Sequence, residues 1–418
     1  MKKFSQQNVA FQEAEKTTIK EIIPEPSGEL FESGISHSEL YLWDVWSSQE
    51  SNEVHLYCLA VSRKDVQGKV IPPELRNHTS FHIRHFLSKN AGQSWSDKGC
   101  YQKPRDKTEG FDSRSIWSGS ILPLRDGRQL TAYTGIRKQS DTLLFQQSLA
   151  LSLSDDWQCV TPNTQHVVSD PLLDWEAITK LGYFLGELSL LGHKDGEADG
   201  PILAWRDPFL LNHEGQIHMY WSAKMAARTP ALGHALLTES ESGYTVEKMY
   251  PPVAMPDGGE YTQLELPKIY HDDVNDRFLL LVSSCNRLHE RQSDEEDDKR
   301  MRLYQSESPD GPWHEFGHHG STLDLAEENM FGVSIVDADF DAQILQYVAP
   351  YTAEAGPDKF LTLSKTHSLD LRQLNHKSKF GSAGLLEIIY SPDIYMPMIA
   401  FLALIIITIV TRKIFYKK

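Results

Sequence analysis

Short apolar segments alternate with short polar segments through most of this chain. Stretches rich in β-branched and aromatic side chains are separated by turns of Gly, Asn, Asp, Pro and Ser. The clearest stretches are "EVHLYCLAVS", "FHIRHFLS", "QLTAYTGI", "LLFQQSLALSLS", "QIHMYWSAK", "RFLLLVSS" and "RLYQSES". This pattern is typical of antiparallel β-strands, and helical periodicity is scarce before the apolar run near the C-terminus. The sequence therefore predicts an all-β fold.

One strand-and-turn unit recurs along the chain. A strand is followed by a small polar turn that ends in Trp in "FLSKNAGQSW", "LSLSDDW" and "YQSESPDGPW". Repetition of such a unit is typical of sheets arranged radially as the blades of a β-propeller, rather than of a sandwich. We therefore expect one propeller domain over residues 34–382.

The two ends of the chain differ from this middle part. Residues 1–33 are polar, with no apolar run of the kind a secretory signal has, and we expect a loosely ordered lead-in. Residues 394–410, "IYMPMIAFLALIIITIV", are uncharged and are followed by the basic "TRKIFYKK". A helix of this length reaches ~25 Å, and long basic side chains make up the rest of a ~30 Å hydrocarbon layer. We expect residues 383–418 to be a linker and a single C-terminal transmembrane helix, the alternative being a buried or amphipathic terminal helix. The side of the membrane that the propeller faces stays open.

Charge and motif content exclude several function classes. The formal net charge is -17, which disfavours a nucleic-acid surface. The four cysteines are widely spaced without a CxxC pair, and no HExxH is present, so neither a zinc site nor a disulfide network is indicated. Neither GxGxxG nor GxxxxGK[ST] is present, which disfavours a nucleotide-dependent enzyme. We expect no metal, no cofactor and no nucleic-acid partner.

Three acidic residues stand in strand-like surroundings where a solvated loop acid is not expected. Asp44 lies between two tryptophans in "LYLWDVWSS", Asp207 lies in "WRDPFLL", and Glu265 lies between leucines in "QLELPKIY". Taken singly, Asp before Pro is a common turn residue, and Glu in a strand is often the outward member of an alternating pattern. Together they supply the nucleophile and the protonated acid that glycoside cleavage requires. The leucines beside Glu265 are expected to disfavour its charged form.

The motifs "WDVWS", "IWSGS", "WRDP" and "LELP" occur in this order along the chain. In this respect the chain resembles the glycoside hydrolase clan of invertases, levansucrases and inulosucrases. It is most similar to the levansucrase-type family, glycoside hydrolase family 68, whose clan includes the family 32 invertases. The resemblance runs from about Tyr41 to Leu371. It implies a five-bladed β-propeller that acts on sucrose or related fructosyl saccharides with retention, by hydrolysis or by fructosyl transfer.

The resemblance also implies a role for each motif residue. Asp44 would be the nucleophile that attacks the anomeric carbon of a fructosyl unit. Asp207 would bind the furanose hydroxyls and stabilise the oxocarbenium-like transition state, with Glu265 as the acid/base. The substrate-binding residues that it implies are Trp43, Trp117, Ser118, Arg206 and Gln263. Arg206 is expected to position the sugar and to keep Asp207 ionised, since the attraction within a buried ion pair seldom exceeds its desolvation cost.

The chain departs from the family pattern at several points. Gln263 stands where the family has a second acid, two residues before the acid/base. Arg287 in "SSCNR" is out of step with the arginine expected on the strand that follows. We expect no signal peptide, which secreted members of the family have, and a C-terminal anchor is not a usual feature of the family. These departures weaken the prediction that sucrose is the donor.

Other functions stay open on the sequence alone. Arabinanases and β-xylosidases also use two aspartates and a glutamate in a five-bladed propeller, but with inversion. The segment "SKNAGQSW" (88–95) resembles the Asp-box turn of sialidases, which are six-bladed propellers with a Tyr nucleophile. A membrane-held propeller that binds glycan or protein without catalysis is a third alternative. The interpretation that we favour is a single catalytic propeller with a saccharide substrate, held at a membrane.

Overall fold

The computed structural model describes residues 22–72, 79–105, 109–137, 146–190, 202–241, 243–289, 292, 296–318, 320–325, 330–350 and 361–375. The chain divides into two compact units, Met1–Leu371 and Arg372–Lys418. The predicted transmembrane segment 394–410 lies outside the described residues. Within the described ranges, no helix is both long enough and apolar enough to cross a membrane.

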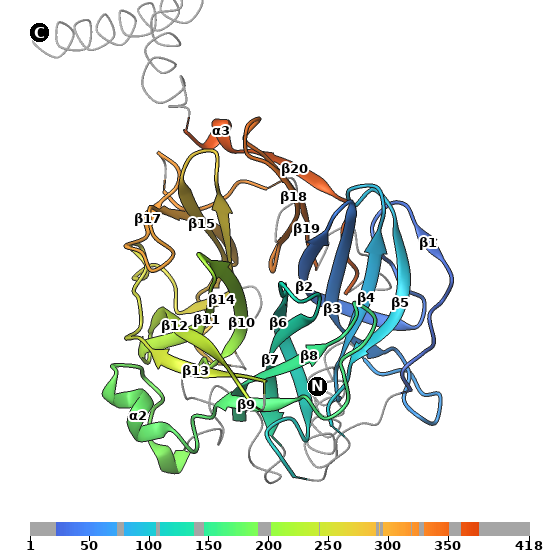
Figure 1. Cartoon of the computed structure of the whole chain (residues 1–418), viewed down its shortest axis with the longest axis horizontal. Helices are drawn as coiled ribbons and strands as arrows, with labels where there is room; N and C mark the ends of the chain where they lie inside the picture. The colour runs from blue at the N-terminus through green and yellow to red at the C-terminus, as the bar shows by residue number, and fades with distance from the viewer. Residues whose placement is uncertain are drawn as a thin grey trace, which may run out of the picture. The chain divides into compact units, whose positions relative to one another are not determined.

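Five antiparallel sheets make up the described part of the first unit, and we number them as blades I to V in chain order (Figure 1). Blade I contains β1 (Leu30–Phe31), β2 (Leu40–Glu50), β3 (Glu53–Ser62), β4 (His82–Ser88) and β5 (Trp95–Gln102). Blade II contains β6 (Ser115–Pro123), β7 (Gln129–Arg137), β8 (Gln146–Ser154) and β9 (His166–Ser169). Blade III contains β10 (Arg206–His213), β11 (Gln216–Ala226), β12 (Thr229–Ser240) and β13 (Gly243–Met249). Blade IV contains β14 (Gln263–Asp272), β15 (Arg277–Cys285), β16 (Arg300–Ser306) and β17 (His314–Glu315), and blade V contains β18 (Ser334–Asp339), β19 (Ile344–Val348) and β20 (His367–Asp370).

Three short helical segments complete the described elements. The helix α2 (Trp175–Lys180) and the 3-10 turn η2 (Leu188–Leu190) lie between blades II and III in the chain, and α3 (Leu371–Asn375) follows blade V. The scarcity of helix matches the prediction from the sequence.

The inner strands of the ring are β2, β6, β10, β14 and β18, and the strands of each blade are counted outward from them. The two-residue β1 lies at the outer edge of blade I, where it pairs with β5. Strand β2 contacts β6, β6 contacts β10, β10 contacts β14, and β18 contacts β2. The remaining link joins β18 to β14, where the Ile335 N–H donates to Tyr270 Oη at 3.3 Å. The prediction of an all-β, five-bladed propeller is confirmed.

Backbone hydrogen bonds between the two ends of the unit close the ring. Ile35 and Leu363 form a bridge in which each N–H donates to the carbonyl oxygen of the other residue, at 2.9 and 3.0 Å. The Leu42 N–H donates to the Leu361 carbonyl oxygen at 2.8 Å. These bonds join blade I to the segment that enters β20. They also satisfy backbone groups that an open ring would expose.

Apolar side chains fill the spaces between neighbouring blades. Trp43 and Tyr57 of blade I pack with Ile116 and Tyr133 of blade II. Equivalent clusters join blades II and III, blades III and IV, and blades I and V. Each fully buried large apolar side chain stabilises the fold by about 1.5–3 kcal/mol, so the interfaces between blades hold the inner strands in fixed positions.

The recurrent turn that ends in Trp has the same place in each blade where it occurs. Trp157 and Trp313 lie between the third and fourth strands of blades II and IV, and Trp95 is the first residue of β5, the fourth strand of blade I counted outward from β2. The repeat seen in the sequence therefore corresponds to one structural unit of the blade.

Candidate active site

The innermost strand of every blade contains an irregularity of register. The shifts lie between Trp43 and Val45, Trp117 and Gly119, Arg206 and Phe209, Glu265 and Lys268, and Ile335 and Asp337. An extra residue in a bulge is left out of the ladder, and its side chain is turned relative to the regular pleat. Two of the predicted acids, Asp44 and Asp207, are themselves such extra residues, and Glu265 borders a third bulge.

Backbone strain accompanies these bulges. Asp44 has a φ of 37°, Asp207 has a φ of 59°, and Leu266, which follows Glu265, has a φ of 53°. A left-handed conformation costs a residue other than glycine roughly 1–3 kcal/mol, so the surrounding structure must hold it in place. Such strain is concentrated at sites where side chains are aimed for function.

Proline accounts for two of the three bulges that carry acids. Pro208 and Pro267 lie inside the register shifts of β10 and β14. A proline has no N–H to donate to the ladder, so pairing is interrupted at each position. The triplets Arg-Asp-Pro and Glu-Leu-Pro thus place an acid beside a break in the strand.

The carboxylate of Asp44 is held by blade II. Ser118 Oγ donates a hydrogen bond of 2.6 Å to Asp44 Oδ2. Gly119, the next residue, allows β6 to approach β7 closely, because a Cβ at that position would lie 1.8 Å from the carbonyl oxygen of Ala132 on β7. The glycine of "WSGS" therefore seats the bulge of β6 against its neighbour, and the serine faces Asp44.

The two predicted tryptophans line the same region. Trp43 is buried and meets Phe81 edge to face, with ring centroids 4.6 Å apart. Trp117 is partly buried and packs against the cluster that contains Trp43. These contacts fix the strand segments on either side of Asp44 and Ser118.

Asp207 is buried and receives several hydrogen bonds. Its Oδ2 accepts from Ser222 Oγ and from the Leu266 N–H, both at 3.1 Å. Its own N–H donates to Thr134 Oγ1 at 2.9 Å, and that hydroxyl donates to the Ser118 carbonyl oxygen at 3.2 Å. Asp207 is therefore linked to blade II through Thr134 and to blade IV through the backbone next to Glu265.

Arg206 bridges two of the acids. Its Nε lies 3.7 Å from Asp207 Oδ2, and its Nη2 donates to Glu265 Oε1 at 3.2 Å. Its Nη1 donates to the Leu203 carbonyl oxygen at 2.7 Å, which anchors the guanidinium. The Glu265 carboxyl thus has a cation as a direct neighbour, while Leu264 packs into the core between blades III and IV.

The electrostatic state of Asp207 differs from the expectation drawn from the sequence. Burial raises the pKa of Asp207 to about 7, Arg206 opposes this rise, and the negative charges of Glu265 and Asp44 add to it. Desolvation outweighs the single cation, because the side chain is only 6% exposed. Arg206 favours the ionised form of Asp207, as predicted, but it does not offset the effect of burial on the pKa. Both Glu265 and Asp44 thus lie close enough to Asp207 to affect its ionisation.

Two buried lysines lie near these acids and were not identified from the sequence. Burial lowers the pKa of Lys268 to about 8, and the charges of Asp44 and Asp207 oppose that fall. Burial likewise lowers the pKa of Lys224 to about 7, Arg206 adds to this, and the Glu265 charge opposes it. Lys224 Nζ donates to the carbonyl oxygens of Ala227 and Thr262, both at 3.0 Å. Their sequence signal is a cation inside an otherwise apolar strand, in "YWSAK" and "LELPKIY".

Gln263 and Arg287 have other partners. Gln263 Nε2 donates to the backbone carbonyl oxygen of Arg287 at 3.1 Å, and Gln263 Oε1 is buried without a hydrogen-bond partner. The Arg287 guanidinium pairs with Asp297, with Nε and Oδ2 3.1 Å apart. The structure therefore joins Gln263 to the backbone of Arg287, while the Arg287 guanidinium pairs with Asp297.

The site thus combines three carboxyl groups from blades I, III and IV with a fixed guanidinium, two lysines of lowered pKa and hydroxyl groups from blade II. Carboxylates and hydroxyls placed in this way are suited to bind the hydroxyl groups of a sugar. An ionised carboxylate can act as a nucleophile, and a second carboxyl can transfer a proton.

No protein-family model and no curated protein sequence matches this chain. Among solved structures, it is similar to the levansucrase of Bacillus subtilis, with a TM-score of 0.57, 16% identity, and 86% of this chain and 90% of that chain covered. A levansucrase variant complexed with sucrose gives the same values. An inulosucrase from Halalkalicoccus jeotgali bound to kestose gives a TM-score of 0.56 and 17% identity, with 85% and 89% covered. At these identities the likeness shows the fold, and the resemblance read from the four motifs is confirmed at that level.

Proposed function

We propose that this protein is a retaining glycoside hydrolase or fructosyltransferase that acts on sucrose or related fructosyl saccharides. The observation that carries this proposal is that Arg206 contacts both Asp207 and Glu265, while Asp44 is connected to Asp207 through Ser118 and Thr134, with all three acids at bulges of inner strands. The likeness in fold to levansucrases and an inulosucrase, with sucrose and kestose bound in two of those structures, supports the choice of sugar.

In the proposed reaction, Asp44 attacks the anomeric carbon of the fructosyl unit. Glu265 donates a proton to the glycosidic oxygen as the bond to the leaving sugar breaks, and a covalent ester between Asp44 and the fructosyl unit forms. Glu265 then takes a proton from water or from an acceptor sugar, which attacks the same carbon and releases Asp44. Two displacements at one carbon give net retention.

Asp207 and Ser118 support this chemistry without forming covalent bonds. The ionised form of Asp207 would accept hydrogen bonds from the furanose hydroxyls, and these bonds strengthen as positive charge develops on the ring. Ser118 Oγ donates to Asp44 Oδ2 at 2.6 Å, and this bond orients the carboxylate for attack. The strained backbone at Asp44 fixes the direction of that carboxylate.

The proposal is tested by incubation of the purified protein with sucrose, raffinose and a fructan, with released glucose and fructose measured separately. With sucrose, equal release indicates hydrolysis, and an excess of glucose indicates transfer to a sugar acceptor. The anomeric form of the first product separates retention from the inversion of an arabinanase-like or β-xylosidase-like enzyme. Binding without turnover of any donor would favour a glycan-binding propeller instead.

Matched variants test the assigned residues. Asp44→Asn and Glu265→Gln should each lower kcat by at least about 10³-fold, because each removes a group that reacts in the chemical step. Glu50→Gln, at the exposed end of the same strand as Asp44, and Asp273→Asn, just after the strand of Glu265, should retain activity. With a fructosyl donor whose leaving group needs no protonation, Glu265→Gln should also accumulate protein that carries one fructosyl unit, detected by mass spectrometry. Undiminished turnover in Asp44→Asn would remove the proposal.

A further inference from the structure

A pair of buried histidines in blade III lies away from the three acids and has no part in the reaction proposed above. His218 on β11 and His234 on β12 approach through His218 Nδ1 and His234 Nε2, which are 3.0 Å apart. Their rings are stacked, with planes inclined by 3°. Tyr220 is the cross-strand partner of His234 and stacks on it at 4.6 Å.

Blade I repeats this arrangement in the same register. His55 and His85 meet through Nδ1 and Nε2 at 3.0 Å, and Tyr57 is the cross-strand partner of His85, with ring centroids 4.6 Å apart. The sequence signal is His-x-Tyr on the second strand, in "HLY" and "HMY", followed by His on the third strand. A stacked histidine pair is therefore a structural element of this propeller and by itself indicates no ligand.

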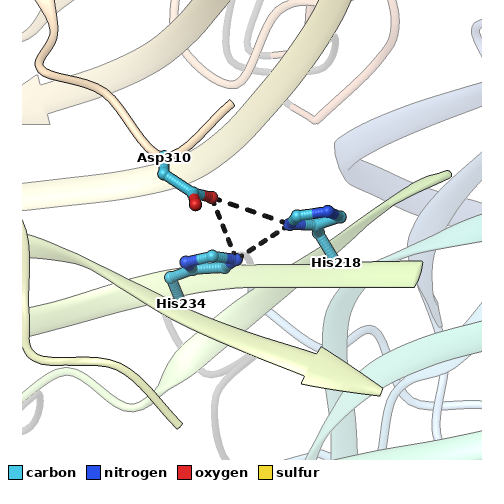
Figure 2. A group of neighbouring side chains, drawn as sticks. All are labelled: His218, His234 and Asp310. Carbon is cyan, nitrogen blue, oxygen red and sulfur yellow. Dashed lines mark hydrogen bonds and ion pairs between the residues drawn. The ribbon is translucent and has the colours of Figure 1, made fainter. Parts of the chain in front are cut away.

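The two pairs differ in the group that the neighbouring blade presents to them. In blade I, the indole of Trp157 stacks on His55 at 4.2 Å. In blade III, the turn after β16 of blade IV presents Asp310 instead, with Oδ1 3.5 Å from His234 Nε2 and 3.7 Å from His218 Nδ1 (Figure 2). Both turns belong to the recurrent unit between third and fourth strands. Among the residues that the structure describes, only the blade III set brings three potential metal-ligand atoms together in this way.

The spacing of these atoms matches the coordination sphere of a transition metal. Ligands about 2.0–2.1 Å from a tetrahedral Zn²⁺ ion are about 3.3 Å from one another. The three separations of 3.0, 3.5 and 3.7 Å lie around that value. Two imidazole nitrogens and one carboxylate oxygen form a donor set that suits divalent first-row metals, and Mg²⁺ or Ca²⁺ would prefer oxygen ligands.

The surroundings of the two histidines favour ligation. Both imidazoles are buried, and imidazole nitrogens are ordinary ligands of Zn²⁺. The Asp310 side chain is 50% exposed, whereas the His234 side chain is 3% exposed. A metal ion can therefore enter from the Asp310 side, where water can supply the fourth ligand.

We propose that His218 Nδ1, His234 Nε2 and Asp310 Oδ1 bind one divalent transition-metal ion, for which Zn²⁺ is the best match. The ion fastens the turn after β16 of blade IV to strands β11 and β12 of blade III. Its role is to stabilise the contact between two blades, because a ligand that binds only the folded state raises stability.

The test uses untagged full-length protein treated with a chelator and then titrated with Zn²⁺ in a calorimeter. Wild type should bind one more equivalent of Zn²⁺ than Asp310→Asn, with a Kd in the micromolar range or below, and Zn²⁺ should raise its Tm. His234→Gln should also lose this equivalent.

The matched controls are Asp156→Asn, in the corresponding turn of blade II, and His85→Gln, in the corresponding pair of blade I, and both should bind Zn²⁺ as wild type does. Co²⁺ in place of Zn²⁺ should give visible d–d absorption in wild type and not in Asp310→Asn.

Two outcomes would overturn the proposal. One is a wild-type protein that binds no more Zn²⁺ than Asp310→Asn, which would leave the histidines as a hydrogen-bonded pair like the one in blade I. The other is an equal loss of binding in His85→Gln or Asp156→Asn. If His234→Gln fails to fold, Asp310→Asn decides alone, because Asp310 is half exposed and the amide preserves its shape.

Discussion

Replacement of Arg206 by glutamine would remove the cation that lies between Asp207 and Glu265. Arg206 Nε is 3.7 Å from Asp207 Oδ2, and both side chains are buried. At an effective dielectric constant of about 20, two unit charges at this distance attract by about 4.5 kcal/mol, which corresponds to about three pH units in the pKa of the acid. The guanidinium charge is delocalised and also faces Glu265, and water can enter the space left by the shorter side chain. We therefore expect the pKa of Asp207 to rise by about one to two pH units.

The pH profile of kcat/KM with sucrose measures this effect, because its acid limb reports groups of the free enzyme. In wild type, activity should fall as the pH decreases through about 7, where Asp207 takes up a proton. In Arg206→Gln, the same limb should lie about one to two pH units higher, so that part of the lost activity returns in alkaline solution. Arg300→Gln, which removes an exposed arginine paired with Asp298, should leave the limb unchanged. If Arg206→Gln only lowers the whole profile without moving its acid limb, Arg206 does not control the ionisation of Asp207.

Two further predictions concern the hydrogen bond to the nucleophile and the stability of the site. Ser118→Ala should lower kcat/KM by about 10- to 100-fold, because it deletes the hydrogen bond that orients Asp44, and should lower the free energy of unfolding by about 1.5–3 kcal/mol, the contribution of one hydrogen bond to a charged group; an unchanged kcat/KM would show that the bond does not orient Asp44. The folded-state pKa of Asp207, about 7, lies above its unfolded value of about 3.9, so the stability that this group contributes is fully present below pH 4 and is lost as the pH rises through 7. Urea denaturation of Asp207→Asn should therefore show an advantage over wild type that grows by up to roughly 4 kcal/mol between pH 4 and pH 8, and a constant difference would contradict the raised pKa.

Local features of the sequence are sufficient to predict much of the fold. The segments "EVHLYCLAVS" and "QIHMYWSAK" correspond to strands β3 and β11, because β-branched and aromatic side chains favour a pleated chain. The turns that end in Trp recur at the same point of three blades, so the repeat indicates a radial arrangement. The number of blades came from the resemblance between motifs, since the spacing of the turns is irregular.

The candidate site is encoded only in part by local features. Proline within a strand marks the bulges next to Asp207 and Glu265, and the glycine of "WSGS" marks the close approach of β6 to β7. These signals are local because they depend on a missing N–H or a missing Cβ. They placed the acids in the strands, but they did not give the charge state of any acid.

The sequence by itself thus determined the strands, the breaks within them and the acidic residues at those breaks. Only the tertiary structure decided which groups meet: Arg206 with Glu265, Lys268 with Asp44 and Asp207, and Asp310 with a histidine pair on another blade. The physical reason is that strand periodicity fixes the face on which a side chain lies, while its neighbours across the ring are set by the packing of blades that are far apart in the chain. Burial, which raises the pKa of Asp207 to about 7, is likewise a property of that packing.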